Sequence, residues 1–335
     1  MISRVDISVI IAIYGVENYI EQSLRAIFSQ TKTEGVEFIL INDATPDNSM
    51  VIARRVIADY PHCDIKIIEF EKNQGVAAVR QTGIDSACGE YILHYDSDDW
   101  CEPTMLEELY RAAQESDADM VLCDTYHSMP SNERYIKQQE APQNGADCMR
   151  LTFQRKISLA SWDKLFRRSL YIGNNVSYKR DLKEGEDVLT NMELYQYIKK
   201  VEYLPKAYLH YRQRGGSLTK QVDEAKIANG INFIGYVEKL LNSYGLSDTY
   251  KRELQDWKLR SKLSILTKLI WNNSKYALIY PEADSYISEY KTSRVRRFAL
   301  QQAAKGRVWL FNLIIGSVLF ANKVLGKSEK CVLYK

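Results

Sequence analysis

The sequence predicts an α/β fold, with a mainly parallel sheet covered by helices and an appended helical region at the C-terminus. Short apolar runs rich in β-branched residues alternate with amphipathic stretches through residues 5–124. This alternation is typical of βαβ units, whose parallel sheet is covered by helices on both faces. Strand patterns stop after GGSLT at 215–219, so we expect one domain at 1–220 and a helical region at 221–335.

The repeating unit begins with the apolar run VDISVIIAI. The stretch that follows it places Tyr19, Leu24 and Phe28 at helical spacing, and the same strand-then-helix pattern recurs along the chain. Strands are predicted at 5–13, 36–43, 64–70, 90–96 and 118–124. Helices are predicted at 15–30, 50–60, 75–88 and 103–116, with Asp47 capping the second and Pro103 near the first turn of the fourth.

Beyond these units the pattern is less regular. The polar, Pro- and Asn-rich segment from 125 to about 150 predicts a loop. Ordered patterns return with SWDKLFRRSLY at 161–171, and the loop LKEGED at 182–187 leads into a helix at 188–200. VEYLP and AYLHYRQR predict two further strands, and residues 223–304 predict successive helices.

The segment VWLFNLIIGSVLFAN at 308–322 is uncharged and lies within a basic region at 305–327. A bilayer-spanning helix needs about 20 apolar residues, and this run is shorter. Two interpretations remain open: a helix lying on the membrane surface between its basic flanks, and a buried C-terminal helix.

Composition and charge exclude some classes of protein. The net charge is +2, from 45 basic and 43 acidic residues, which argues against nucleic-acid binding as the main task. The six cysteines form no CxxC pair, and no histidine stands at zinc-ligand spacing from two of them, so we expect reduced thiols in the cytosol. MISRVD leads directly into a strand, and no signal peptide is expected.

Acidic residues gather where the predicted strands end. YILHYDSDDW is a strand that runs into Asp96, Asp98 and Asp99, and Asp43 closes the second strand. The carboxyl ends of parallel strands meet at one edge of a sheet, which is where such folds bind ligands. Neighbouring carboxylates repel one another and resist desolvation, so we expect a cation or ligand to offset them.

Four segments together resemble a known enzyme family: SVIIAIYGVENYIEQSLRAIFSQ, FILINDATPDNS, NQGVAAVRQTGIDSACGEYILHYDSDDW and SWDKLFRR. They resemble the family 2 glycosyltransferases, which are inverting, metal-dependent enzymes of the Rossmann-like GT-A fold that use nucleotide-diphosphate sugars. The chain departs from the family pattern at Ala44, which stands where the family has glycine. That departure implies a turn without positive φ, or a strained one.

The resemblance implies a donor site on the strand ends. Asp98 would bind Mn²⁺ or Mg²⁺, with Asp96 contacting the metal's water shell or the ribose. Asp43 would accept a hydrogen bond from the base, and the backbone around Tyr14 would line the base pocket. Arg80 matches a basic residue that faces the nucleotide sugar.

The resemblance also implies the acceptor side of the site. Asp187 would be the general base, with Glu186 orienting it or contacting acceptor. In YRQRGGSLT, Arg214 would pair with the diphosphate and Ser217 would add a hydroxyl bond. Trp162 matches a position that stacks on acceptor sugar, or is structural.

The implied function is transfer of a hexosyl or N-acetylhexosaminyl group to a glycan or lipid-linked glycan in surface polysaccharide synthesis. Uridine is the family's commonest base, and the expected place is the cytoplasmic face of the membrane. The alternative is a non-catalytic sugar or nucleotide-sugar binding protein on a decayed transferase fold. A dinucleotide-binding oxidoreductase is disfavoured, because the turn IYGVENY has one glycine where GxGxxG is needed.

Overall fold

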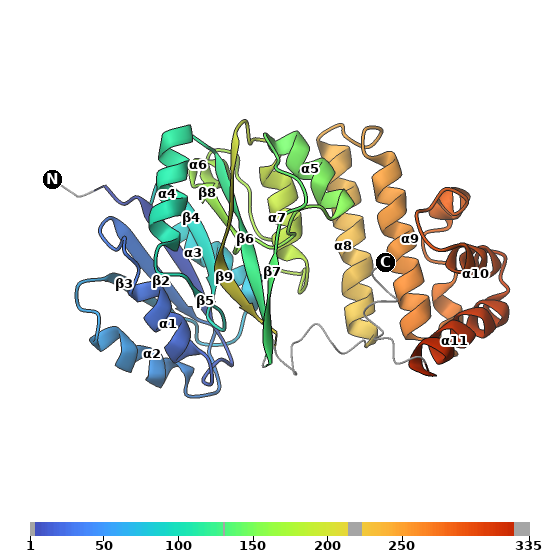
Figure 1. Cartoon of the computed structure of the whole chain (residues 1–335), viewed down its shortest axis with the longest axis horizontal. Coiled ribbons are helices and arrows are strands. Elements are labelled where there is room, and N and C mark those ends of the chain that lie inside the picture. The colour runs from blue at the N-terminus through green and yellow to red at the C-terminus, as the bar shows by residue number, and fades with distance from the viewer. Residues whose placement is uncertain (1–3, 130, 214–222, 325–335) are drawn as a thin grey trace. The chain divides into compact units, whose positions relative to one another are not determined.

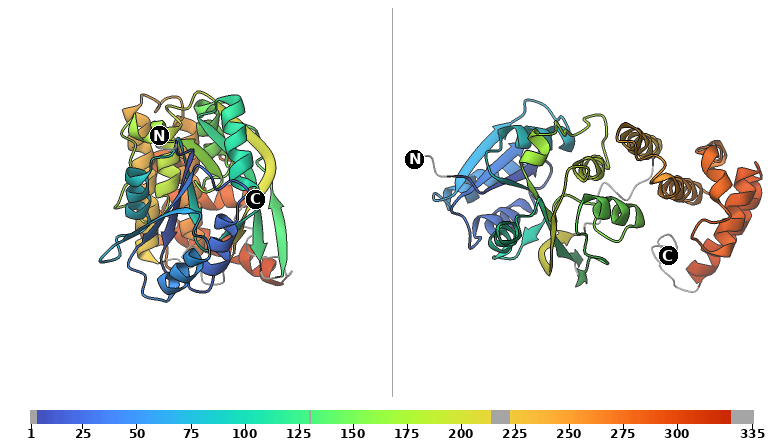
Figure 2. Two further views of the ribbon diagram at one scale, coloured as in Figure 1. Left: turned by 90° about the vertical axis from the view of Figure 1, so that its left-hand side faces the viewer. Right: turned by 90° about the horizontal axis from the view of Figure 1, so that it is seen from above.

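The computed structural model describes residues 4–129, 131–213 and 223–324 (Figure 1). The chain divides into two compact units, Met1–Lys220 and Gln221–Lys335, called unit 1 and unit 2 below. Unit 1 holds a nine-stranded sheet, and unit 2 holds the helices coloured orange to red in Figures 1 and 2. The predicted fold class, a mainly parallel sheet with C-terminal helices, is confirmed.

Four parallel strands form the first half of the sheet, in the order β3-β2-β1-β4. They are β1 (Ile7–Ile13), β2 (Val36–Asn42), β3 (Asp64–Glu69) and β4 (Tyr91–Asp96). In register, Ile13 pairs with Asn42 and Ala12 pairs with Asp96. The carboxyl ends of β1, β2 and β4 therefore meet at one rim, as the positions of the acids predicted.

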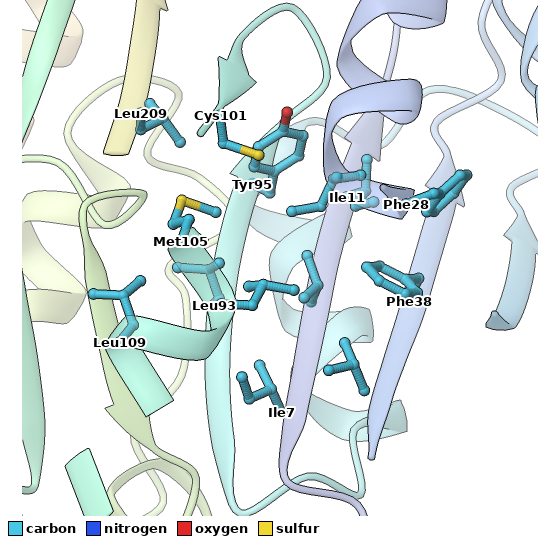
Figure 3. Close-up of a cluster of buried hydrophobic side chains, with 14 of the residues drawn as sticks. Ile7, Ile11, Phe28, Phe38, Leu93, Tyr95, Cys101, Met105, Leu109 and Leu209 are labelled. Atoms are coloured by element: carbon cyan, nitrogen blue, oxygen red, sulfur yellow. The ribbon is translucent and has the colours of Figure 1, made fainter. Parts of the chain in front are cut away.

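Helices cover both faces of these strands. Alternate residues of β1, such as Ile7 and Ile11, pack with α1 (Ile20–Phe28), α2 (Ser49–Ala58) and α4 (Met105–Ser116) in one apolar core (Figure 3). Helix α3 (Val76–Ser86) contacts β1 and β2 on the other face. A Cβ built on Gly83 would lie only 2.3 Å from Cγ2 of Ile10, so glycine permits this close approach.

The second half of the sheet is mixed. Strand β8 pairs antiparallel with β4 and β6, β6 runs parallel to β9, and β5 and β7 pair antiparallel with β9 and β6. Its elements are β5 (Trp100–Cys101), β6 (Met120–Met129), β7 (Asn132–Ile136), α5 (Gly145–Gln154), β8 (Lys164–Arg167), α6 (Ser169–Ile172), α7 (Glu186–Leu194) and β9 (Val201–Arg212).

Two predictions fail in this half. The segment from 125 to about 150 is not a loop, because it contains the end of β6, the strand β7 and the start of α5. Most side chains of β7 are exposed, so the strand lacks the apolar alternation that would reveal it. The two strands expected at VEYLP and AYLHYRQR are one strand, β9, whose pairing shifts by two residues at Pro205 and Lys206.

Unit 2 is helical throughout its described residues, as predicted. It comprises α8 (Glu224–Ser243), α9 (Lys251–Lys268), η1 (Ser274–Tyr276), η2 (Pro281–Tyr286), α10 (Arg294–Ala304) and α11 (Val308–Val324). Side chains of α9, η2, α10 and α11 share one apolar core. Among the residues that the structure describes, no helix is both long and apolar enough to cross a bilayer.

Candidate functional site

The loop after β1 is fixed to the loop after β2 by hydrogen bonds. The backbone N–H groups of Gly15 and Glu17 donate to Thr45 Oγ1 (2.9 Å) and Asp47 Oδ2 (3.0 Å). Asp47 also accepts from Ser49, although the capping residue of α2 is Asn48 and not the predicted Asp47. Burial opposes ionisation of Asp47, but its hydrogen bonds hold its pKa down to about 2.

Asp43 is buried and holds the loop that enters α3. Its carboxylate accepts from Gln74 N (2.6 Å), Gly75 N (2.9 Å) and Asn73 Nδ2 (2.9 Å). A contact between Asp43 and a base stays a prediction. Tyr14, the other residue expected at the base, is half exposed on the fixed loop after β1.

Ala44 follows Asp43 with φ at +53°, in the left-handed region. A residue with a Cβ atom adopts this conformation at a cost of about 1–2 kcal/mol. The alanine at this position implied either a turn without positive φ or a strained turn, and the structure has the strained turn.

At the end of β4, acidic side chains alternate with a serine whose side chain bonds to the neighbouring strand. Asp96 and Asp98 are partly buried, whereas the Ser97 side chain between them donates to the Ala12 carbonyl of β1. Asp99 is buried; one of its carboxylate oxygens accepts from Arg212 N (2.7 Å), and the other has no hydrogen-bond partner among the residues that the structure describes. Burial, with the charges of Asp98 and Asp96, raises the pKa of Asp99 well above its usual range.

Arg80 connects carboxylates from two other elements, β4 and α7. From α3 its Nη1 donates to Glu186 Oε1 at 2.6 Å, and its Nη2 donates to Asp96 Oδ1 at 3.4 Å. Burial alone would lower the pKa of Arg80, but Asp96, Tyr178 and Glu186 raise it, so the guanidinium stays charged. Burial raises the pKa of Asp96, and Arg80 opposes this shift.

Glu186 and Asp187 form the first turn of α7, which begins two residues earlier than predicted, because the loop at 182–187 was expected to include both residues. Gly185 supplies the left-handed turn (φ +86°) that starts the helix. Burial, and next the charge of Asp187, raise the pKa of Glu186 to about 7, against the effect of Arg80. Asp187 is less buried, and its Oδ1 accepts from Val188 N at 2.8 Å.

Two residues with contacts at the site were missed from the sequence. Arg212, in β9, donates through Nε to the Asp98 carbonyl at 2.9 Å and lies 4.5 Å from the Trp100 ring centre. Tyr178 lies beneath the Arg80 guanidinium, 5.9 Å from ring centre to Cζ. Arg212 stands in the run YRQR, two residues before Arg214, the predicted diphosphate ligand.

Four further side chains near these segments contact buried or aromatic neighbours. Lys164 has a packing role, because it is fully buried with its ammonium on Asp163 Oδ1 (2.7 Å). Trp162 stacks on Tyr211 with ring centres 5.5 Å apart, and its contact with an acceptor sugar stays a prediction. His94 lies buried beside two tyrosines, and burial lowers its pKa well below the usual range. His210 stacks on Trp100 at 4.9 Å. The predicted diphosphate ligands Arg214 and Ser217 lie outside the described residues.

The carboxylates at the end of β4 fit a divalent metal only in part. Within the described ranges, no three or more His, Cys, Asp and Glu side chains gather so as to hold a metal ion. Mg²⁺ and Mn²⁺ accept carboxylate oxygens, and Mg²⁺ usually binds through one or two carboxylates plus water and substrate phosphates. Asp96 and Asp98 therefore fit as the protein's share of a site that a diphosphate completes.

Comparisons with known proteins find similarity to glycosyltransferases. A family model described as "Glycosyl transferase family 2" matches residues 8–173. The chain is 29% identical over 279 residues to "Uncharacterized glycosyltransferase EpsJ" of Bacillus subtilis (strain 168), covering 78% of this chain and 76% of that protein. It is 27% identical over 247 residues to "Poly(ribitol-phosphate) beta-glucosyltransferase" of Bacillus spizizenii, covering 72% of this chain and 37% of that protein.

Solved structures share the fold. The crystal structure of S. aureus TarS 1-349 in complex with UDP-GlcNAc matches with a TM-score of 0.69 at 18% identity, covering 97% of this chain and 93% of that chain. The mannosyltransferase PcManGT from Pyrobaculum calidifontis, in complex with GDP-Man and Mn²⁺, matches with a TM-score of 0.54 at 14% identity, covering 97% and 88%.

Proposed function

The chain belongs to the family 2 glycosyltransferases, and on that premise we propose an inverting enzyme that transfers a hexosyl or N-acetylhexosaminyl group from a nucleotide-diphosphate sugar. UDP is the proposed nucleotide, supported by the UDP-GlcNAc complex of TarS. A glycan or lipid-linked glycan is the proposed acceptor, in surface polysaccharide or teichoic acid synthesis at the cytoplasmic face of the membrane. The poly(ribitol-phosphate) glucosyltransferase among the relatives supports this class.

The observation that carries the proposal is the bridge made by Arg80. It connects Asp96, on the rim where a diphosphate would bind, to Glu186, beside the proposed base Asp187. The two halves that an inverting transferase needs, leaving-group stabilisation and proton removal, are thereby held at a fixed spacing.

Asp187 is assigned as the general base. Glu186 is committed to the ion pair with Arg80, whereas Asp187 is partly exposed in the same helical turn. Asp187 takes the proton of the acceptor hydroxyl as the new glycosidic bond forms. The bond between the anomeric carbon and the diphosphate breaks on the opposite face of the sugar, and the electron pair leaves with the nucleoside diphosphate.

Asp96 and Asp98 are assigned as the metal ligands, with Mn²⁺ or Mg²⁺ as the ion. A divalent cation bound there would act as a Lewis acid on the diphosphate. Asp98 is positioned for this role by Arg212, which holds its carbonyl oxygen. Arg80 and the backbone N–H groups of the rim loops orient the surrounding side chains.

A donor screen tests the proposal. The purified chain is incubated with Mn²⁺ and a panel of UDP- and GDP-sugars, and release of nucleoside diphosphate is measured. We expect metal-dependent hydrolysis of one donor. Asp98→Asn should abolish the metal response, and Asp187→Asn should spare donor binding but stop transfer to acceptor.

Asp64→Asn is the matched control, because Asp64 is an exposed aspartate at the amino end of β3, away from the rim. Its hydrolysis rate should equal that of the wild type. Retained metal response in Asp98→Asn would remove the metal assignment. If no donor is hydrolysed and no nucleotide raises the melting temperature with Mn²⁺, the enzyme proposal is wrong and a sugar-binding role is left.

A further inference from the structure

Helix α11 carries apolar side chains on two opposite sides. Phe311 and Ile315 are buried in the core of unit 2. Trp309, Leu313 and Phe320 are instead 62%, 49% and 71% exposed. At about 100° per residue, these three positions fall within about 40° of one another and opposite the buried pair. One side of α11 is therefore buried, as expected of a buried C-terminal helix. The opposite side presents an exposed apolar surface, as expected of a helix that lies on a membrane.

Trp271 extends this surface from the chain just after α9. A Cβ atom built on Gly316 would lie 3.7 Å from Cζ2 of Trp271, and Gly316 falls on the same side of α11 as Leu313 and Phe320. Trp271 is 65% exposed and has φ at +75°, a costly conformation for a bulky residue. We name Trp271, Trp309, Leu313 and Phe320 the outer apolar face.

The stretch of chain that contains α11 carries basic residues and no acidic ones. Between Tyr290 and Ser328 the sequence contains no aspartate or glutamate. Its basic residues are Lys291, Arg294, Arg296, Arg297, Lys305, Arg307, Lys323 and Lys327. Lys305 and Arg307 precede α11 and Lys323 lies at its end, and all three are exposed, so exposed positive charge stands at both ends of the apolar face.

We propose that the outer apolar face docks unit 2 on a bilayer that contains anionic phospholipid, with α11 lying in the plane of the membrane. Tryptophan is favoured at the boundary between headgroups and acyl chains, and lysine and arginine are attracted to anionic headgroups. The 17 residues of α11 are too few to span the hydrocarbon core but suit an interfacial helix. This inference stands on unit 2 alone and does not depend on the donor or acceptor proposed above.

Vesicle sedimentation tests the proposal, using the full chain without donor or acceptor. Vesicles of phosphatidylcholine alone are compared with vesicles containing about 30% phosphatidylglycerol. We expect binding to the anionic vesicles to be at least about tenfold stronger and to fall as salt screens the charges. Absent or equal binding to the two vesicle types would overturn the proposal.

Substitutions locate the surface. The triple variant Trp309→Ser, Leu313→Ser, Phe320→Ser should weaken binding to anionic vesicles by at least about tenfold. Val51→Ser is the matched control, since Val51 is 70% exposed in α2 of unit 1, and its binding should be unchanged. Thermal unfolding and nucleotide-sugar hydrolysis check that the triple variant is folded. Wild-type binding by a folded triple variant would overturn the proposal.

A second set of substitutions keeps the test valid if the triple variant does not fold. The double variant Lys305→Glu, Lys323→Glu leaves the apolar core intact and should lose the preference for phosphatidylglycerol. Sedimentation equilibrium measures whether the chain is a monomer or a dimer. If the apolar face instead pairs two copies of the chain, the triple variant turns a dimer into a monomer while wild-type vesicle binding is absent, and the proposal is wrong.

Discussion

Replacing Arg80 with methionine is the most informative perturbation of the site. The Arg80 side chain is 7% exposed, and it contacts Glu186 (7% exposed) and Asp96 (28% exposed). Methionine has a comparable length but no charge, so the substitution leaves two carboxylates in a poorly solvated place without their cation. Breaking a buried ion pair in this way costs roughly 3–5 kcal/mol of unfolding free energy.

The loss of unfolding free energy caused by Arg80→Met should be larger at high pH than at low pH. In the wild type the pKa of Glu186 is raised from 4.5 to about 7, so the folded protein binds a proton within that window that the unfolded chain does not. The contribution of Glu186 to stability is therefore greatest below the lower value and falls as pH rises through the upper one. Without Arg80 the pKa values of the Glu186 and Asp96 carboxyls should rise further. Lowering the pH should therefore increase the unfolding free energy of the variant more than that of the wild type.

Hydrogen exchange in peptides from β1 and β4 measures the opening of unit 1. At about pH 8, a loss of about 3 kcal/mol accelerates exchange roughly a hundredfold, and the acceleration should shrink toward about pH 5. Arg54→Met is the control, because the Arg54–Glu69 pair (3.1 Å) is half exposed on both sides and should contribute less than about 1 kcal/mol. Equal exchange rates in the Arg80 and Arg54 variants at both pH values would refute the reasoning.

Three other substitutions test the site and its support. Ala44→Gly relieves a positive φ and should raise the unfolding free energy by about 0.5–1 kcal/mol in calorimetry; a lower melting temperature would contradict the strain. Lys164→Met strands the buried Asp163 and should cost roughly 3–5 kcal/mol in urea denaturation, whereas an unchanged midpoint would argue against a packing role. Arg212→Gln removes the bond to the Asp98 carbonyl and should raise the Mn²⁺ concentration for half-maximal donor hydrolysis at least about tenfold; an unchanged titration would exclude that positioning role.

The sequence predicts the parallel half of the fold well because its signals are local. Runs such as VEFILIN are buried on both faces, and amphipathic helices separate them, so strand, helix and rim follow from spacing alone. The strand β7 has four exposed residues out of five and gives no such signal. Pro205 ends an apolar pattern in the sequence but occupies a bulge in a continuous strand, because a shift in pairing with β6 accommodates it.

Some residues of the candidate site could likewise be predicted from local sequence, whereas others depend on contacts between distant parts of the chain. Asp96 and Asp98 could be placed on the rim because Asp96 ends a buried strand and Asp98 follows it by two residues. The hydrogen bond between Arg80 and Glu186 joins residues 106 apart in sequence, and only the tertiary fold brings them together. Arg212 was missed because an arginine near the end of a strand is common on protein surfaces, whereas here it bonds back to the end of β4.

Two other elements, α3 and β9, hold the acids at the end of β4, which explains how the chain tolerates them together. Asp96 is offset by Arg80 from α3, and Asp99 accepts the backbone N–H of Arg212 from β9. Arg212 also fixes the Asp98 carbonyl, so the loop is oriented before any ligand binds. Because Arg80 contacts both Asp96 and Glu186, a change at either acid alters the charge balance of the other. The proposed donor and acceptor halves of the site are therefore coupled through one guanidinium, and substitutions at Asp96 and Glu186 should not be additive.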